Sequence, residues 1–240
     1  MPEDILLEVC VDSPEGLAAA ISGGADRIEL CSALEIGGLT PSPGLMALAA
    51  RVQVPVYAMI RSRPGDFVYG EEDIAALLGD IDAVHAAGLD GVVLGANHID
   101  GSLNRDVLGR LADHAKGLGR TLHRAFDLTG PDFTRAIDIA VELGFERILS
   151  SGGQATVLSG LDALAACFAH AGDRIVIMPG SGVSLETLGA IKARLPLREI
   201  HSSCSTVATP TGTALELGFV SPRPKHTDAG IVKAMKVSLL

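Results

Sequence analysis

The chain has 240 residues, a formal net charge of −10, and 48% hydrophobic but only 3% aromatic residues. The acidic balance argues against nucleic acid and anionic membranes as partners, because both attract basic surfaces. No apolar run approaches the roughly 20 residues of a membrane-spanning helix. About 250 residues is the usual size of a single-domain (β/α)8 barrel, so we expect one domain over residues 1–240.

The start of the chain, Met1 to Asp4, is acidic and lacks the basic residues and apolar run of a signal peptide. In a chain without an export signal, few and widely spaced cysteines indicate reduced thiols rather than a disulfide framework. The four cysteines are Cys10, Cys31, Cys167 and Cys204.

Short apolar runs alternate with helical stretches along the whole chain. At Gly24, Gly88 and Gly144 a glycine ends an Ala-rich helical stretch, and an apolar run follows at once. The predicted strands are Ile5–Cys10, the run ending at Leu30, Val54–Ile60, the run ending at Leu94, Arg120–Phe126, the run ending at Leu149, Arg174–Met178 and Arg198–Ser202. The predicted helices are Pro14–Ser22, Pro43–Arg51, Glu71–Ala87, Arg105–Lys116, Pro131–Leu143, Thr156–Ala171, Leu185–Arg194 and a last one from about Thr227 to Lys236.

Strict alternation of strand and helix implies a parallel sheet. Eight repeats favour a closed TIM barrel over an open doubly wound sheet. No Gly-x-Gly-x-x-Gly pattern follows the first predicted strand, which weakens the dinucleotide-binding alternative.

Residues 203–226 depart from this rhythm, because they carry Thr, Pro and Gly without a helical pattern. A loop this long is unusual unless it is functional or mobile. It leaves the carboxyl end of the eighth strand. We expect it either to fold over the barrel mouth or to form a surface insertion.

Charged and thiol residues alternate at three predicted strand ends, in the segments Glu8–Cys10, Glu29–Cys31 and Glu199–His201. Side chains two residues apart leave the same face of a strand, and a carboxylate is costly in an apolar helix–sheet interface. This face therefore points into the barrel. Because the eighth, first and second strands are neighbours in a barrel, we expect a layer of carboxylates beneath a layer of thiols and imidazole. The expected lower layer is Glu8, Glu29 and Glu199, and the expected upper layer is Cys10, Cys31 and His201.

Buried carboxylates need cations nearby. Arg27, Arg61, Arg124 and Arg147 are available. The lower layer is then either an ion-pair layer that fixes the barrel register or a group that relays protons and orients a substrate.

Two thiols and an imidazole form a soft ligand set that suits Cu(I) or Zn²⁺. We expect Cys10 and Cys31 to share one Cu(I), with His201 as third ligand. No Cys-x-x-Cys spacing supports this site, so two buried, metal-free cysteines are the alternative.

Glycine-rich loops follow the sixth and seventh predicted strands. Their backbone amides can approach an anion near a helix start, and arginines at the mouth could hold its other end. The alternative is two tight turns that need positive φ. The expected anion-binding residues are Arg61, Arg63, Ser151, Gly152, Gly153, Gly180, Ser181 and Gly182.

No lysine lies on a predicted strand, which argues against a Schiff-base aldolase. Acid–base chemistry would then fall to histidines and acids at the strand ends. The candidate catalytic residues are Glu8, Glu29, His123, Arg124, Asp127 and His201.

Several of these motifs together resemble the CutC copper-homeostasis family. The resemblance covers nearly the whole chain, with Arg61-Ser62-Arg63 standing where the family has Arg-Pro-Arg. It implies a cytoplasmic TIM barrel, Cu(I) binding, possible self-association, and copper ligands at Cys10 and Cys31. The segments that carry it are Leu7–Cys10, Gly24–Cys31, Gly37–Ser42, Met59–Phe67, His123–Asp127, Ser150–Gly153 and Met178–Gly182.

Two functions remain open. The first is a copper-homeostasis protein that binds Cu(I). The second is a TIM-barrel enzyme, a lyase, isomerase or hydrolase, that acts on a small anionic or phosphorylated metabolite.

Overall fold

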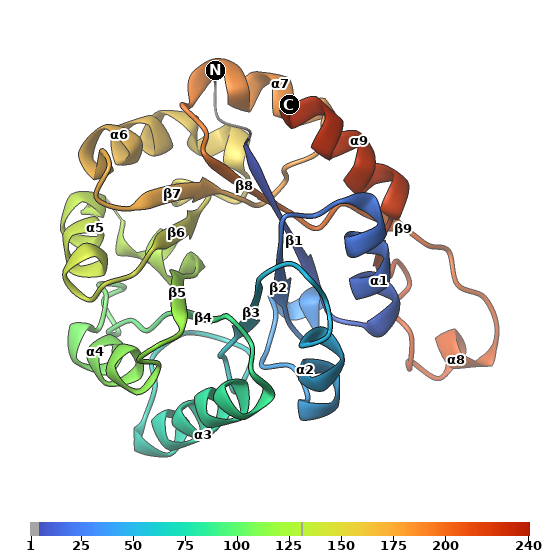
Figure 1. The fold of residues 1–240 in the computed structure, drawn as a ribbon, viewed down its shortest axis with the longest axis horizontal. Coiled ribbons are helices and arrows are strands. Elements are labelled where there is room, and N and C mark those ends of the chain that lie inside the picture. Colours follow the sequence, from blue (N-terminus) through green and yellow to red (C-terminus); the bar gives the residue numbers. More distant parts are fainter. Residues whose placement is uncertain (1–4, 131) are drawn as a thin grey trace.

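The computed structural model describes residues 5–130 and 132–240. Eight parallel strands form a nearly closed barrel with helices around it (Figure 1), which confirms the predicted TIM-barrel fold. The sheet order is β7-β6-β5-β4-β3-β2-β1-β8, and β7 contacts β8 at the seam. The barrel strands are β1 (Leu6–Val11), β2 (Arg27–Leu30), β3 (Val56–Met59), β4 (Gly91–Leu94), β5 (Gly119–Leu122), β6 (Arg147–Ser150), β7 (Val176–Pro179) and β8 (Glu199–Ser202).

Local chemistry marks the start or the end of several helices. In the first, the Ser13 hydroxyl accepts from the Gly16 amide at 3.0 Å, Pro14 takes the first position, and Gly24 ends the helix with φ 93°. Pro131, expected to open the fifth helix, lies outside the described residues. The long helices are α1 (Pro14–Gly23), α2 (Pro43–Ala49), α3 (Glu71–Ala87), α4 (Arg105–His114), α5 (Phe133–Glu142), α6 (Leu161–Ala171), α7 (Leu185–Arg194) and α9 (Ala229–Leu239).

Three 3₁₀ turns lie in the loops at the barrel mouth and before α6: Leu34–Ile36, Arg124–Thr129 and Val157–Gly160. The last of these replaces the start of the predicted helix at Thr156. No helix of the described residues is both long enough and apolar enough to cross a membrane.

The register between neighbouring strands places the carboxylates at different heights. Cys10 of β1 pairs with Glu29 of β2, and Glu8 pairs with Arg27 on one side and His201 on the other. The expectation of one carboxylate layer below one thiol layer is therefore wrong, although Glu8 and Glu29 are buried as expected. The reason is general, because closing a barrel requires tilted strands whose register is staggered from one to the next.

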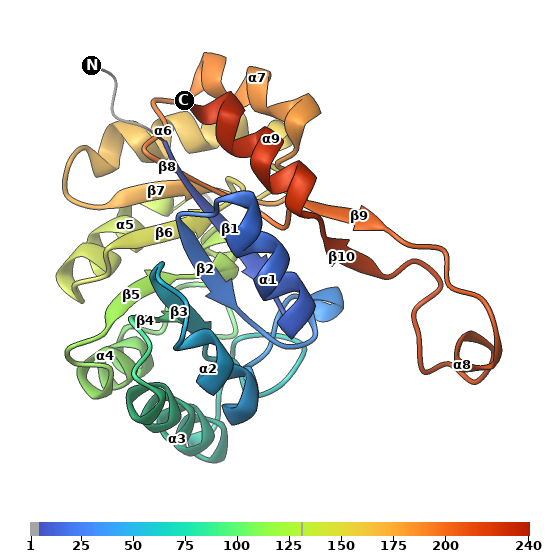
Figure 2. The same cartoon turned by 45° about the vertical axis from the view of Figure 1, so that its right-hand side comes forward.

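Residues 203–226 form an arm. β9 (Ser205–Val207) and β10 (Lys225–Thr227) pair antiparallel, and the short helix α8 (Thr213–Glu216) lies between them in sequence. The arm extends away from the barrel (Figure 2), so its tip does not fold over the mouth. Only the base of the arm, including Ser203 and Lys225, lines the mouth cavity.

Candidate functional site in the barrel mouth

A cavity of about 800 Å³ opens at the carboxyl ends of the barrel strands. This volume is typical of small-molecule sites. Residues from seven different strand ends or following loops contribute to its wall, so the barrel topology itself assembles the site. The polar residues of this wall include Cys10, Glu29, Arg61, His123, Ser181 and His201.

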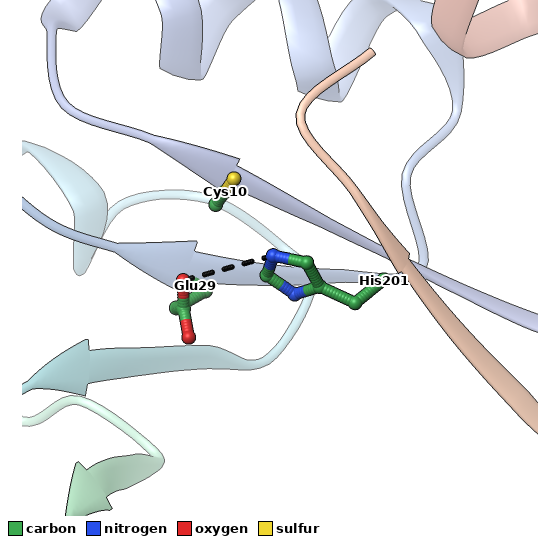
Figure 3. A group of neighbouring side chains, drawn as sticks. All are labelled: Cys10, Glu29 and His201. Atoms are coloured by element: carbon green, nitrogen blue, oxygen red, sulfur yellow. Dashed lines mark ion pairs between the residues drawn. The ribbon is translucent and has the colours of Figure 1, made fainter. Parts of the chain in front are cut away.

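Cys10, Glu29 and His201 form a compact group in this cavity (Figure 3). The ligand atoms of the three side chains all lie within 4.8 Å of one another. Glu29 Oε2 lies 3.9 Å from His201 Nε2. All three residues are at least nine-tenths buried. A thiol, a carboxylate and an imidazole at this spacing can surround a metal ion.

Glu8 orients His201 from below. Its Oε1 lies 2.8 Å from His201 Nδ1, and its Oε2 accepts from Arg27 Nε. Burial alone would raise the pKa of Glu8, but Arg27 and His201 lower it to about 2. An ionised Glu8 therefore accepts the Nδ1 proton and leaves Nε2 directed toward Glu29. This carboxylate–imidazole pair is the arrangement that commonly supports a metal-binding histidine.

The charges around the group favour protonation of two of its members in the metal-free protein. Burial opposes the charged imidazole, yet Cys10, Glu29 and Glu8 raise the pKa of His201 well above its usual range. Burial also raises the pKa of Glu29, and the Glu8 carboxylate adds to the rise. A bound metal would have to displace a proton from His201 Nε2.

Cys31 lies outside this group. It is fully buried in a small apolar cluster with Tyr57, Met59 and Val93, and its Sγ donates to Glu29 Oε2 at 3.6 Å. Burial raises the pKa of Cys31 well above its usual range, and Glu29 adds to the rise. Among the described residues, Glu29 thus takes the place that we expected Cys31 to have beside Cys10. The strand stagger explains the difference, because Glu29 lies level with Cys10 and Cys31 lies two residues further along the chain, just past the end of β2.

Deeper in the barrel, arginines and carboxylates form a continuous buried network. Arg27 pairs with both Glu8 and Glu199. Arg147 Nε donates to Glu199 at 3.0 Å, and its Nη1 donates to Thr121 at 3.1 Å. This network corresponds to the ion-pair alternative. Of the expected cations, it contains Arg27 and Arg147 but neither Arg61 nor Arg124.

The first glycine loop already holds a carboxylate of the protein itself. Asp127 accepts from the amides of Ser151 (3.2 Å) and Gly153 (3.0 Å) and from the Ser150 hydroxyl (2.6 Å). Arg124 Nε donates to the same carboxylate at 2.8 Å. The Gly152 amide donates to the Ser150 hydroxyl oxygen at 2.9 Å. All three amides are therefore occupied within the protein, which corrects the expectation for Ser151, Gly152 and Gly153. Arg124 and Asp127 serve to fix this loop.

The second glycine loop differs. Ser181 and Gly182 line the mouth cavity and have positive φ values of 72° and 76°. The Gly180 amide, in contrast, donates to the Ser150 carbonyl at 3.0 Å. Anion binding by Ser181 and Gly182 stays a prediction.

The two arginines after β3, Arg61 and Arg63, lie in different environments. Arg63 pairs with Asp66 (3.2 Å) and Asp73 (3.1 Å) at the surface. Arg61 is buried in the cavity wall, next to Phe67 and close to His123. Sequence reasoning did not single out Phe67, because an apolar residue in a loop carries no chemical signal of its own.

Comparison with known proteins places the chain among its relatives. The CutC family profile matches residues 5–206, which include all eight barrel strands. The chain belongs to the CutC family. This confirms the resemblance seen in the motifs, and the family match ends within β9.

Two bacterial CutC family proteins are similar over nearly their full lengths. The protein of Sinorhizobium medicae is 57% identical over 236 residues, covering 98% of this chain and 96% of the relative. That of Caulobacter vibrioides strain NA1000 is 51% identical over 236 residues, covering 97% and 96%. The crystal structure of Streptococcus agalactiae CutC, which is named for copper homeostasis, has a TM-score of 0.79 and 30% identity. It covers 83% of this chain and 98% of its own.

Proposed function

We propose that this chain is a cytoplasmic copper-homeostasis protein that binds Cu(I) in the barrel mouth, with Cys10 and His201 as ligands. The observation that carries the proposal is the approach of a thiol and an imidazole in one buried group at the mouth. Thiolate and imidazole are soft or intermediate ligands of the kind that select Cu(I). The copper-homeostasis name of the Streptococcus agalactiae relative supports the same assignment.

Two carboxylates have separate roles in this site. Glu8 holds the Nδ1 side of His201, so that Nε2 is the atom offered to the metal. Glu29 supplies an oxygen, which is a hard ligand and a poor one for Cu(I). We therefore expect two principal ligands, with Glu29 beside them and Cys31 as its hydrogen-bonding neighbour.

Titration with Cu(I) against a chromophoric competing chelator tests this proposal. The Cys10→Ala variant should lose at least tenfold in affinity, whereas the matched Cys31→Ala variant should bind within a few-fold of the wild type. Wild-type affinity in Cys10→Ala would contradict the proposal. An equal loss of affinity in both variants would instead support Cys10 and Cys31 as the two principal Cu(I) ligands.

A second candidate function is an enzyme, a lyase, isomerase or hydrolase, acting on a small anionic metabolite. Its support is the size of the cavity, about 800 Å³, which exceeds the needs of one metal ion. Incubation with a panel of small carboxylates and phosphate esters, followed by proton NMR, should show conversion of one of them. Conversion at the wild-type rate by the Glu29→Gln variant would show that Glu29 in the mouth takes no part in the reaction, and would contradict this candidate function.

A further inference from the structure

Arg61 is a buried cation without a carboxylate partner among the described residues. It is 5% exposed, and all the hydrogen bonds of its guanidinium go to backbone carbonyls. Nη1 donates to Ile36 and Gly38, both at 3.0 Å, and Nη2 donates to Gly65 at 2.8 Å. Its Nε has no hydrogen-bond partner and no contact with solvent. A buried charge is costly unless an opposite charge compensates it.

The other arginines near the strand ends show that this state is unusual. Arg27 and Arg147 share Glu199, and Arg124 has Asp127. The charge of Arg61 instead faces a cavity that can admit a ligand. The missing countercharge is the first sign of an anion site.

His123 provides a second unpartnered polar group in the same wall. It is 3% exposed, and its Nδ1 accepts from the Ala125 amide at 3.1 Å. The single proton of a neutral imidazole must then lie on Nε2, which has no partner among the described residues. Burial and the Arg61 charge lower the pKa of His123 to about 3, so the ring is a neutral N–H donor at physiological pH.

Phe67 joins these two groups into one surface. The Arg61 guanidinium carbon lies 5.1 Å from the Phe67 ring centroid, and the Phe67 and His123 ring centroids are 4.7 Å apart. The wall therefore presents a cation and a neutral donor that both contact one aromatic ring. All three residues line the mouth cavity.

We propose that this wall binds a small organic oxyanion, a carboxylate with a second oxygen acceptor, with the carboxylate at Arg61 and the second oxygen at His123 Nε2. The ligand class follows from the two groups. A fixed cation selects an oxyanion, and a single neutral N–H donor selects a carbonyl or hydroxyl oxygen nearby. The site is separate from the Cys10–His201 pair but shares its cavity. An enzyme of the second candidate function would use this oxyanion site to bind its substrate. The oxyanion proposal requires only that the ligand binds, and it requires no catalysis.

Calorimetric titration of the metal-free protein tests the proposal with three probes: pyruvate, acetate and inorganic phosphate. Pyruvate carries both oxygens and should bind saturably. Acetate lacks the second oxygen and should bind about five- to tenfold more weakly, the factor expected for one lost hydrogen bond. Absence of saturable pyruvate binding would overturn the proposal. Phosphate binding that equals or exceeds that of pyruvate would overturn the carboxylate assignment.

Variants of the two neighbouring arginines locate the site. Arg61→Gln should weaken pyruvate binding by at least tenfold, whereas Arg63→Gln should bind pyruvate as the wild type does. Arg63 is the matched control, because it lies two residues away but pairs with surface carboxylates. Wild-type affinity in a folded Arg61→Gln protein would contradict the proposal.

Because Arg61 also holds three loop carbonyls, its variant can fail to fold, and His123→Asn provides an independent test. The Asn Oδ1 can replace Nδ1 as acceptor for the Ala125 amide, while the Nε2 donor is lost. Pyruvate affinity should then fall to that of acetate, with acetate affinity unchanged. An undiminished preference for pyruvate would contradict the assigned role of His123. Pyruvate binding by Cys10→Ala should be retained, which separates this inference from the copper proposal.

Discussion

The lower half of the barrel and its mouth differ in whether their buried polar groups have partners. In the lower half, Arg27 and Arg147 link Glu8 and Glu199 into a network of ion pairs. In the mouth, Arg61 Nε, His123 Nε2 and Glu29 Oε1 have no hydrogen-bond partner among the described residues. Since an unpaired buried polar group is destabilising, its presence points to a ligand rather than to the stability of the fold. The lower network therefore stabilises the barrel, and the mouth is where we propose that the protein binds its ligands.

The largest effect is expected from breaking the lower network. Arg27→Met leaves Glu8 and Glu199 buried without their shared cation, which should lower the free energy of unfolding by about 3–5 kcal/mol. Urea denaturation followed by circular dichroism measures this loss.

The exposed pair of Arg105 and Glu142 offers a control for burial, because Arg105→Met should cost less than about 1 kcal/mol. Equal losses in the two variants would contradict the structural role assigned to the lower network. Addition of Glu199→Gln to Arg27→Met should recover part of the loss.

An intermediate effect is expected from His123 as the pH falls. The pKa of its ring is lowered by burial and Arg61 to about 3, whereas an unfolded histidine has a pKa of about 6.5. Between these values the unfolded chain binds a proton that the folded chain does not, so stability decreases as the pH falls from 6.5 toward 3.

At pH 4.5 this contribution amounts to about 2–3 kcal/mol relative to pH 7. Denaturation of wild type and His123→Asn at both pH values isolates it from the titration of other groups. The wild type should lose more stability than the variant on acidification. Parallel losses would show that the folded ring takes up a proton and is not a neutral donor.

The smallest effect is expected from the difference in accessibility between Cys10 and Cys31. Cys10 lines the cavity and is 7% exposed, whereas Cys31 is fully buried and its pKa is raised by burial and Glu29. N-ethylmaleimide should therefore label Cys10 before Cys31, as followed by mass spectrometry of peptides. Faster labelling of Cys31 would place the more reactive thiol after β2 instead of on β1.

The barrel was predictable from local patterns, because each strand and helix has its own hydrophobic periodicity and is bounded by residues such as Gly and Pro. Which side chains point inward was also predictable, since alternate residues of a strand share a face. Their relative heights were not, because the stagger between strands is a property of the closed barrel. This is why Cys10 was expected beside Cys31 and lies level with Glu29.

Two other differences come from contacts between distant segments. Glycines in 151–153 correctly indicated a loop with amides free to bind an anion, but the anion is the carboxylate of Asp127, more than twenty residues earlier. Nothing in the sequence of 203–226 distinguishes a loop that folds over the mouth from a projecting arm. The antiparallel pairing of β9 with β10 determines this outcome.

X-ray absorption at the copper edge of the Cu(I)-loaded protein tests the central claim most directly, because it counts the ligands by element. We predict one sulfur and one nitrogen neighbour, from Cys10 and His201, and an unchanged spectrum in Cys31→Ala. Two sulfur neighbours, or a spectrum that survives Cys10→Ala, would contradict the account.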